Sequence, residues 1–420
     1  MYENTTNRPK AVLVSVDIGE FDTEVSLEEL EELAETAGVD VAGKVTQKRD
    51  TYDTATCIGS GRLEEIRDFC DQQEVDMLIF DHELTGTQLR NIEEIAQTAV
   101  LDRTMLILDI FAQRARTSEG KLQVELAQQK YRLPRLTGMG KALSRLGGGI
   151  GTRGPGESRL ETDRRHIKRR IAALEEELAQ LEKRRDLIRK RRKKDNHLTA
   201  AIVGYTNAGK STLLNALTHA DVLAENQLFA TLDLTSRSVE LPDGKSVILV
   251  DTVGFIRRLP HQLIEAFQST LEEAANADLI LLVCDSSSEE LDSQLSVCEK
   301  LLAELGCGGI PTLRVYNKCD KLPYLPDIRD GGVLISAKTG QGFDLLLKRI
   351  AEELGGTSRR MQLCIPYAEA GFIARIREDG KVFAEEYTDQ GIMLDALVDY
   401  RLLRQAEQYL APPDPDSLEE

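Results

Sequence analysis

The sequence predicts an α/β protein of several domains, and three observations support this. Its 420 residues are enough for two to four domains that each bury a core. Short apolar runs typical of buried strands alternate with helix-length segments before residue 118 and again from residue 196 onward. A long stretch with the apolar spacing of a helical hairpin separates these two ranges. The apolar content of 41% and the charged content of 30% are typical of a globular protein.

Residues 1–117 are expected to form an N-terminal α/β domain with a largely parallel sheet. A capping box at Ser26-Leu-Glu-Glu29 opens the first helix, which should end at Ala37. Gly59-Ser-Gly61 is read as a tight turn before a helix through Cys70; contact with phosphate or RNA is the less favoured alternative. The remaining elements expected are a helix at Gly86–Thr98 and strands at Ala11–Gly19, Val39–Val45, Asp76–Phe80 and Thr104–Leu108.

Residues 118–195 are expected to form a basic helical hairpin. Its first helix covers Ser118–Arg132 and should be stopped by Pro134. The second helix is longer, and its apolar residues repeat at the spacing of a coiled-coil seam that Arg185 interrupts. We expect the two helices to pair in antiparallel orientation. The seam consists of Ile167, Ile171, Leu174, Leu178, Leu181 and Ile188.

The net charge of −18 is unevenly distributed along the chain. Residues 131–194 contain 20 Lys/Arg and 8 Asp/Glu, so this segment carries +12 and leaves −30 for the rest. An acidic body with one basic arm indicates local contact with a polyanion rather than general coating of nucleic acid. A charged helix face that is simply solvated is the alternative interpretation.

The segment Leu136–Glu157 between the two helices is rich in glycine. A flexible linker is one interpretation, but arginine, proline and isoleucine stand where a plain linker would have serine and glycine. Glycine lets the backbone approach a phosphate chain closely, and arginine adds charge and planar stacking. We therefore expect this tip of the hairpin to contact RNA. The residues expected to do so are Arg145, Gly147, Gly148, Gly149 and Arg153.

Residues 196–355 are expected to form a P-loop domain. Gly204-Tyr-Thr-Asn-Ala-Gly-Lys-Ser211 fits GxxxxGK[ST] and lies between the strand-like Leu198–Val203 and the helix-like Ser211–Thr218. Backbone N–H groups of such a loop and helix N-terminus can point at phosphate oxygens. Lys210 is expected to reach the β- and γ-phosphates, and Ser211 to ligate Mg²⁺. An ordinary glycine turn before a helix is the disfavoured alternative.

Two further segments are expected to sense the γ-phosphate. Asp251-Thr-Val-Gly254 follows the strand-like Ser246–Val250; the Asp251 carboxylate suits Mg²⁺, directly or through water, and Gly254 would offer its N–H to the phosphate. Thr231, in Phe229-Ala-Thr-Leu-Asp233, is expected to bond Mg²⁺ and the γ-phosphate, so that this loop orders only with GTP. A common turn and an ordinary loop threonine are the alternatives.

Two segments are expected to select guanine. The Asp320 carboxylate of Asn317-Lys-Cys-Asp320 can accept from guanine N1–H and the exocyclic amine, whereas adenine would leave this acceptor unpaired. Asn317 should brace the loop, and the stem of Lys318 should cover the base. Ser336-Ala-Lys338 would complete the base pocket through backbone N–H groups.

The residues expected at the site fall into three overlapping sets. Hydrolysis is assigned to Lys210, Thr231 and Gly254, and Mg²⁺ to Ser211, Thr231 and Asp251. The nucleotide-binding set comprises Gly204, Tyr205, Thr206, Asn207, Ala208, Gly209, Lys210, Ser211, Thr212, Phe229, Ala230, Thr231, Asp251, Thr252, Val253, Gly254, Asn317, Lys318, Asp320, Ser336, Ala337 and Lys338.

Residues 356–410 are expected to form a small C-terminal α+β domain. Its predicted order is strand, helix, strand, strand and a final helix, at Met361–Pro366, Glu369–Ile376, Val382–Tyr387, Gly391–Val398 and Tyr400–Leu410. Residues 411–420, with three prolines and an acidic end, are expected to be disordered.

The composition excludes several classes of protein. No apolar run approaches the roughly 18 residues that a membrane span needs, and the first ten residues lack a signal-peptide core. The seven cysteines form no CxxC and the five histidines lack metal-ligand spacing. We therefore expect reduced thiols and a cytoplasmic location. We also expect a monomer in solution.

The nucleotide boxes resemble those of the translation-factor-related GTPases. Many small GTPases carry a glutamine after DxxG that orients the attacking water, whereas this chain has Phe255 there. Intrinsic hydrolysis should therefore be slow or need outside help. In several GTPases with an asparagine at the position of Asn207, that side chain helps to hold K⁺ near the β- and γ-phosphates, and the resemblance suggests the same hypothesis here.

Over nearly its whole length, the chain resembles the HflX family of ribosome-associated GTPases. The most specific segment is Leu146-Gly-Gly-Gly-Ile-Gly-Thr-Arg-Gly-Pro-Gly-Glu157, and Phe229–Asp233, Asp251–Phe255 and Ile365-Pro-Tyr367 add to it. The resemblance implies a GTPase that binds the large (50S) ribosomal subunit, with its arm near ribosomal RNA at the peptidyl-transferase region. It would help to split or rescue stalled ribosomes under stress, and GTP hydrolysis would favour release. Some relatives are said to bind adenine nucleotide through the N-terminal domain, where this chain has no separate phosphate motif.

Two other functions stay open at the level of sequence. The chain could be a GTP-gated regulatory switch that recruits a protein partner through its hairpin. Such binding would be insensitive to salt, whereas contacts with RNA phosphates are salt-sensitive. The basic arm could instead lie on a membrane surface, although its seam residues suit a helix partner and no lipidation signal is present.

Overall fold

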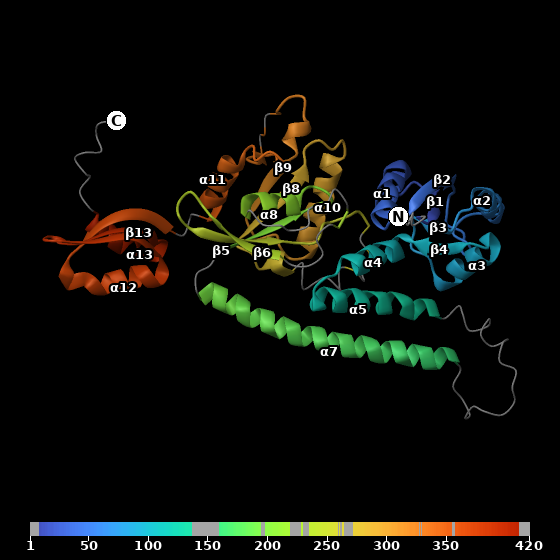
Figure 1. Cartoon of the computed structure of the whole chain (residues 1–420), viewed down its shortest axis with the longest axis horizontal. Coiled ribbons are helices and arrows are strands. Elements are labelled where there is room, and N and C mark those ends of the chain that lie inside the picture. Colours follow the sequence, from blue (N-terminus) through green and yellow to red (C-terminus); the bar gives the residue numbers. More distant parts are fainter. Residues whose placement is uncertain are drawn as a thin grey trace, which may run out of the picture. The chain divides into compact units, whose positions relative to one another are not determined.

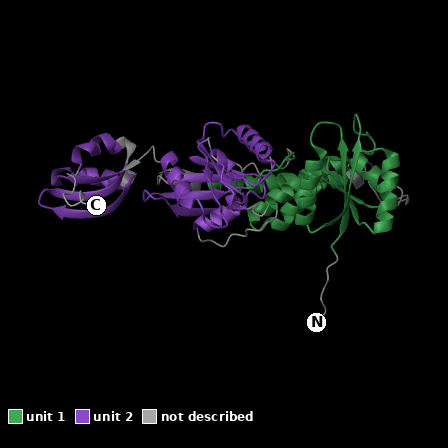
Figure 2. Ribbon diagram, turned by 90° about the horizontal axis from the view of Figure 1, so that it is seen from above, with its two compact units in different colours: residues 1–186, 223–234, 253–271 green, residues 187–222, 235–252, 272–420 purple. Residues whose placement is uncertain are grey.

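The chain forms two compact units in a computed structural model (Figures 1 and 2). Unit 1 comprises Met1–Asp186, Leu223–Leu234 and Val253–Leu271, and unit 2 comprises Leu187–Val222, Thr235–Thr252 and Glu272–Glu420. The structure describes residues 8–136, 159–194, 198–218, 228–229, 235–258, 260, 263, 272–326, 328, 330–354 and 358–410.

A four-stranded, fully parallel sheet forms the centre of unit 1, in the order β2-β1-β3-β4. In the central strand, residues 11–16 are all buried, as expected when helices cover both faces of a parallel sheet. The predicted α/β domain with a parallel sheet is thereby confirmed. The strands are β1 (Lys10–Asp17), β2 (Asp40–Lys48), β3 (Met77–Phe80) and β4 (Ala99–Asp102).

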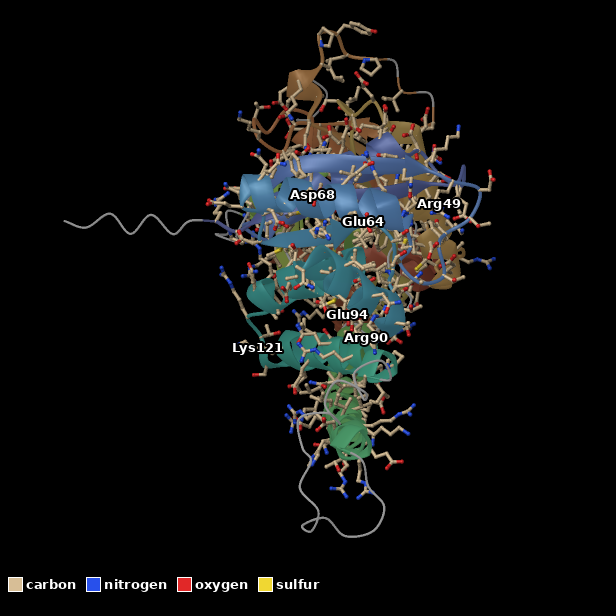
Figure 3. The ribbon with its side chains drawn as sticks, turned by 90° about the vertical axis from the view of Figure 1, so that its right-hand side faces the viewer. Arg49, Glu64, Asp68, Arg90, Glu94 and Lys121 are labelled. Carbon is tan, nitrogen blue, oxygen red and sulfur yellow. The ribbon has the colours of Figure 1, made fainter. Side chains whose placement is uncertain are left out.

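Six helices lie among the described residues before residue 195. Charged side chains, among them Glu64, Asp68 and the ion-paired Arg90 and Glu94, lie on the outward side of the second and third helices (Figure 3). Val12 and Val14 of β1 pack in the core beneath these two helices. The helices are α1 (Thr23–Thr36), α2 (Ser60–Gln73), α3 (Gly86–Ala96), α4 (Arg103–Arg114), α5 (Ser118–Arg135) and α7 (Arg159–Lys194).

The strand predicted at Thr104–Leu108 is wrong, because these residues lie in helix α4. The Asp102 side chain caps this helix by accepting a hydrogen bond from the Met105 N–H at 2.9 Å. The neighbouring strand is β4, which ends at Asp102. A short apolar run alone does not distinguish a strand from a buried turn of helix, and here the Asp102 cap indicates a helix.

Two helix ends also differ from the prediction. Helix α1 begins at Thr23 rather than at Ser26, because the Asp22 side chain accepts from two N–H groups of the first turn. Helix α5 includes Pro134 and ends at Arg135. Proline removes only one backbone donor there, and in the last turn this loss does not end the helix.

Helices α5 and α7 form the predicted antiparallel hairpin (Figure 1). Glu119 pairs with Arg185 near one end, and Lys130 pairs with Glu175 at 3.0 Å further along. Leu174 of the seam is fully buried, whereas Ile167, Ile171, Leu178 and Leu181 are half-buried. The ion pair with Glu119 explains how an arginine occupies the seam.

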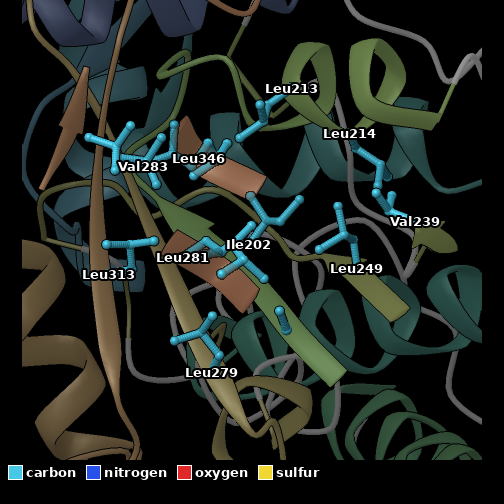
Figure 4. Close-up of a cluster of buried hydrophobic side chains, with 14 of the residues drawn as sticks. Ile202, Leu213, Leu214, Val239, Leu249, Leu279, Leu281, Val283, Leu313 and Leu346 are labelled. Carbon is cyan, nitrogen blue, oxygen red and sulfur yellow. The ribbon is translucent and has the colours of Figure 1, made fainter. Parts of the chain in front are cut away.

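Unit 2 contains a six-stranded sheet in the order β10-β9-β8-β5-β7-β6, with only the edge strand β6 antiparallel. Side chains of β5, β7 and β8 pack against helices α8 and α11 in one core, shown in Figure 4. The strands are β5 (Leu198–Gly204), β6 (Thr235–Glu240), β7 (Ser246–Asp251), β8 (Leu279–Asp285), β9 (Thr312–Asn317) and β10 (Val333–Leu334). The helices are α8 (Lys210–Thr218), α10 (Leu291–Glu304) and α11 (Phe343–Leu354).

The C-terminal residues of unit 2 form an antiparallel sheet in the order β11-β13-β12 with helices on one face. The predicted strand-helix-strand-strand order is confirmed; its final helix gives way to a 3₁₀ turn at Glu407–Tyr409. The elements are β11 (Ser358–Ile365), α12 (Ala370–Asp379), β12 (Lys381–Thr388), β13 (Gly391–Asp399) and α13 (Tyr400–Ala406). Among all the helices described, none combines the length and the apolarity that a membrane crossing requires.

Candidate active site

The loop between β5 and α8 depends on two glycines. Gly204 has φ +153, and a Cβ there would lie 2.1 Å from the Val283 carbonyl oxygen. Gly209 has φ +91, and a Cβ there would lie 2.3 Å from Asn317 Nδ2. Asn207 adopts the left-handed conformation with φ 60, which asparagine tolerates better than most residues. The GxxxxGK[ST] pattern therefore reflects close backbone approaches on both sides of the loop.

Lys210 is buried at the start of α8 and donates to the carbonyl oxygens of Gly204 at 3.2 Å and Tyr205 at 2.8 Å. Burial lowers the pKa of its ammonium, while the nearby Asp251 carboxylate opposes this shift. The positive charge is thus held by carbonyl dipoles of the same loop. Phosphate oxygens would be a stronger partner for this charge than neutral carbonyls.

The residues expected to hold Mg²⁺ in unit 2 lie together. Ser211 Oγ donates to Asp251 Oδ2 at 2.8 Å, and both side chains are buried, Ser211 in the first turn of α8 and Asp251 at the carboxyl end of β7. A hydroxyl and a carboxylate are hard oxygen ligands, and Mg²⁺ commonly takes one or two of these and completes its shell with phosphate oxygens and water. The donor set therefore fits this ion. Thr231, the third expected ligand, lies outside the described residues.

Asn317 joins the phosphate loop to the base-binding loops. Its Nδ2 donates to the Ala208 carbonyl oxygen at 2.8 Å, and its Oδ1 accepts from the Ala337 N–H at 2.8 Å. The side chain is buried, so both hydrogen bonds are shielded from water. These contacts are those expected of a bracing residue.

The base end of the site has a fixed acid. Asp320 is exposed, and its Oδ1 accepts from the buried Ser336 hydroxyl at 2.6 Å, which leaves the other carboxylate oxygen to face solvent or a ligand. Lys318 has φ 64, and its Nζ pairs with Asp285 Oδ2 at 2.7 Å. Burial alone would raise the pKa of Asp285, but hydrogen bonds from Lys318 and Ser287 outweigh it and lower that pKa.

Two of the three amides expected to reach the base donate within the protein. The Ser336 N–H donates to the Gln341 carbonyl oxygen, and the Ala337 N–H donates to Asn317 Oδ1. A base oxygen would have to compete with these acceptors. Ser336 thus acts on the site by orienting the Asp320 carboxylate rather than through its own N–H, a role that the tripeptide pattern did not reveal.

The DxxG segment begins in unit 2 and continues in unit 1. Thr252 is buried, and its hydroxyl donates to the Ile202 carbonyl oxygen at 2.8 Å, which fixes the end of β7 to β5. Val253, Gly254 and Phe255 are buried residues of unit 1. A buried phenylalanine has no group that can orient water.

The expected residues are divided between the two units and the residues that the structure leaves undescribed. Within unit 2 it assembles the phosphate loop with Tyr205 and Thr206 buried and Thr212 half-buried, the Asp251–Thr252 pair, and the two base loops. Phe229 is a buried residue of unit 1, and Ala230 lies outside the described residues. The expected RNA-contact residues at the hairpin tip, Arg145, Gly147, Gly148, Gly149 and Arg153, also lie outside them.

Asp285 is a site residue that the sequence reading missed. It ends β8, next to β5 and β9, and fixes the ammonium of Lys318 while also accepting from the Ser287 hydroxyl at 2.6 Å. The sequence does contain a signal for Asp285, because an acidic residue directly follows the apolar run Leu279–Cys284. The same signal identified Asp251.

Three family models together match most of the chain. The N-terminal region of GTP-binding GTPases matches residues 24–112, and their middle region matches residues 114–192. A family described as a 50S ribosome-binding GTPase matches residues 199–318, which include the phosphate loop, the DxxG segment and Asn317.

Curated relatives match the chain from end to end. A protein named GTPase HflX from Caldanaerobacter subterraneus subsp. tengcongensis is 52% identical over 398 residues, covering 95% of this chain and 93% of the relative. GTPase HflX from Escherichia coli K12 is 39% identical over 421 residues, covering 98% and 99%. Among solved structures, a GTP-binding protein from Sulfolobus solfataricus in complex with GDP is 28% identical and covers 83% of this chain and 99% of its own, with a TM-score of 0.44.

Proposed function

The chain belongs to the HflX family of GTPases, and we propose that it uses GTP to bind the large ribosomal subunit and to split or rescue stalled ribosomes. It is a GTP-hydrolysing enzyme whose GTPase domain is of the ribosome-binding kind. Splitting or rescue under stress, and a monomeric cytoplasmic protein that acts on the ribosome, belong to the proposal. The main support for this proposal is the basic hairpin, which is joined to a GTPase domain and has the Gly-rich segment between its two helices in the sequence.

Positive charge on the long arm of the hairpin supports binding to RNA. Arg164, Lys168 and Arg169 are exposed on α7. Arg170 is also partly exposed but pairs with Glu125 of α5 through two contacts of 2.6 Å. Phosphate contacts made by the exposed group would release counterions, so binding should weaken steeply with salt.

The N-terminal domain supports the root of the Gly-rich segment. Arg135, the last residue of α5, donates to the Leu84 carbonyl oxygen at 3.0 Å and pairs with Glu83 at 2.9 Å. Its guanidinium lies 3.3 Å from the ring centroid of Tyr131. At Gly86 a Cβ would lie 2.6 Å from the Arg135 carbonyl oxygen, so only glycine permits this approach. A firmly held root would let the tip be presented in a defined direction.

The proposed mechanism of hydrolysis uses residues of this site. Lys210 offers a buried positive charge beside the loop that would hold the β- and γ-phosphates. Ser211 and Asp251 would hold Mg²⁺, which when bound neutralises developing negative charge on phosphate oxygens. Gly254 would offer its N–H to the γ-phosphate, and Thr231 would close the loop over it. Because Phe255 is buried and apolar, no glutamine orients the attacking water, and we expect a slow basal rate that ribosomes stimulate.

Asn207 is proposed to help hold K⁺ near the phosphates. Its left-handed backbone sets it apart within the loop, and its side chain is half-buried rather than withdrawn into the core. An amide oxygen is a suitable ligand for an alkali cation, whose charge would substitute for an arginine finger.

We propose that the γ-phosphate orders the loop around Thr231 and the segment Asp251–Phe255, and that this change favours docking of the hairpin and the C-terminal domain on the large subunit. Hydrolysis would reverse the change and favour release.

The proposal is tested by deleting Gly147–Gly156 from the full-length chain. We expect basal GTP hydrolysis to be unchanged and ribosome splitting to be lost. A second variant replaces Gly147–Gly156 with a Gly/Ser segment of equal length, which distinguishes the effect of the tip's residues from the effect of its length. It should also fail to split ribosomes. If either variant splits ribosomes as well as the natural chain does, the tip assignment is wrong. Lys210→Ala, in contrast, should abolish nucleotide binding or turnover.

A further inference from the structure

Described residues from the two segments that carry the expected γ-phosphate sensors contact the N-terminal domain. Residues 223–234, which include Thr231, and residues 253–271, which include Gly254, both belong to unit 1. We call these two ranges the switch segments. They are part of the GTPase domain in sequence, yet Phe229, Arg257 and Arg258 contact residues before 112.

Arg258 anchors the second switch segment to a buried acid. Its guanidinium donates to Asp81 Oδ1 at 2.6 Å and to the Ser26 hydroxyl, and it lies 4.0 Å from the ring centroid of Phe21. The Asp81 side chain is fully buried directly after β3, whereas 31% of the Arg258 side chain is exposed. A charged hydrogen bond to a shielded carboxylate is a strong contact.

Arg103, the first residue of α4, completes this anchor. It donates to the same oxygen, Asp81 Oδ1, at 3.0 Å and to the Arg257 carbonyl oxygen at 3.4 Å, and it pairs with Glu29. Two arginines are thereby balanced by two carboxylates. The Arg103 side chain is only 4% exposed, so this cluster forms a fixed part of the N-terminal core.

Helix α4 also contacts the first switch segment. Phe229 is buried, and its ring meets the ring of Phe111 edge-on with a centroid distance of 4.6 Å. Phe111 lies on the same helix as Arg103, two turns further along. Phe229 has φ 54, an unusual conformation for a bulky side chain that the packing has to compensate.

We propose that α4 together with Asp81 forms a receptor surface for both switch segments, through which the N-terminal domain responds to the nucleotide. This inference rests on the proposed roles of Thr231 and Gly254. Arg258 is four positions after Gly254, a reach of at most about 14 Å, and Thr231 is two positions after Phe229, a reach of about 7 Å. Over such short links, a movement of Thr231 and Gly254 toward a γ-phosphate would strain the contacts at Phe229 and Arg258.

Thermodynamic linkage makes this effect reciprocal. If GTP weakens the receptor contacts, loss of those contacts strengthens binding of GTP relative to GDP by the same factor. Couplings of this kind usually change affinity by about 5- to 150-fold. The hairpin helix α5 follows α4 directly, so the same contacts can pass the nucleotide state toward the proposed ribosome-binding tip.

The test compares amide hydrogen exchange of residues 103–114 in the full chain, loaded with Mg²⁺ and either GDP or a non-hydrolysable GTP analogue. We expect at least fivefold faster exchange with the analogue in the natural chain. Arg258→Met keeps the stem over Phe21 but removes the charge, and it should abolish the difference and favour the analogue over GDP by about fivefold or more. Arg258→Lys should restore part of the difference, because a single ammonium still pairs with Asp81.

Arg62→Met is the matched control, since Arg62 makes an exposed pair with Glu65 on α2 within the same unit. It should behave like the natural chain. Phe111→Leu provides a second route that leaves the ionic cluster intact, and it should reduce the difference. Equal exchange in the two nucleotide states of the natural chain, or an undiminished difference in Arg258→Met, would overturn the inference.

The outcomes separate this inference from the proposed function. If the chain splits ribosomes but shows no nucleotide-dependent exchange in α4, the proposed function stands and the proposed receptor surface is refuted. If the chain shows the exchange difference but does not bind large subunits, the receptor surface stands and the ribosomal role is refuted.

Discussion

Replacing Asn317 with alanine is the sharpest test of how the site is held together. The change removes the donor to the Ala208 carbonyl oxygen and the acceptor for the Ala337 N–H, both at 2.8 Å in a buried position. Each buried group left without a partner costs about 1–3 kcal/mol. Water entering the vacated space would recover part of the loss, so we expect about 2–4 kcal/mol in total.

The loss should appear in nucleotide affinity, because binding needs the loop arrangement that the brace maintains. At about 1.4 kcal/mol per tenfold, the dissociation constant for a fluorescent GDP should rise roughly 30- to 1,000-fold. Equilibrium titration measures this directly. Asn317→Asp keeps the acceptor for Ala337 but sets a carboxylate oxygen against the Ala208 carbonyl, so it should weaken binding at least as much as alanine does.

Cys319→Ala is the control within the same segment. Cys319 is buried, but no side-chain hydrogen bond of it is described, and its replacement should change affinity less than tenfold. Nucleotide binding by Asn317→Ala within threefold of the natural chain would refute the bracing argument.

Three further predictions concern specificity, pH and ions. Asp320→Asn should weaken GTP binding by about 1.5–3 kcal/mol and improve binding of xanthosine triphosphate, because the amide can donate to the carbonyl that replaces the guanine amine; competition binding that still prefers GTP would contradict this. Burial lowers the pKa of His82 to about 4, and its Nε2 accepts from the Val16 N–H at 2.9 Å. The unfolded chain therefore takes up a proton below about pH 6.5 that the folded chain refuses, so stability present above this pH is lost as the pH falls toward 4, by up to about 1.4 kcal/mol per pH unit. Urea unfolding of His82→Gln should show a shallower loss than the natural chain, and equal slopes would refute the assignment. GTP turnover should be faster in KCl than in NaCl at equal ionic strength, and equal rates would remove the role proposed for Asn207.

Local patterns predicted most of the elements because each carries its own signal. The phosphate loop needs glycine where a Cβ would meet Val283 or Asn317, so the motif and its context are visible in a single stretch of sequence. The same applies to the parallel strand β1, which is buried on both faces and reads as a nearly continuous apolar run. The strand predicted at Thr104–Leu108 was wrong because the run is short and the Asp102 cap was not recognised.

Contacts between distant segments could not be predicted in this way. The Arg258–Asp81 pair joins residues 177 positions apart, and neither residue is unusual in its local sequence. Phe111 lies in helix α4, whose residues Thr104–Leu108 were predicted as a strand, so its contact with Phe229 had no basis in the pattern. Ser336 belongs to a tripeptide that carries no meaning alone, and its role depends on the fold bringing Asp320 within 2.6 Å.

The central claim is that the triphosphate state attaches this chain to the large ribosomal subunit through a basic arm. Sedimentation of the purified chain with isolated large subunits, in GDP and in a non-hydrolysable GTP analogue at roughly 50 and 200 mM salt, tests it most directly. We predict at least tenfold tighter binding with the analogue, and a steep loss of that binding at the higher salt. Equal binding in both nucleotides, or binding that salt does not weaken, would contradict the account.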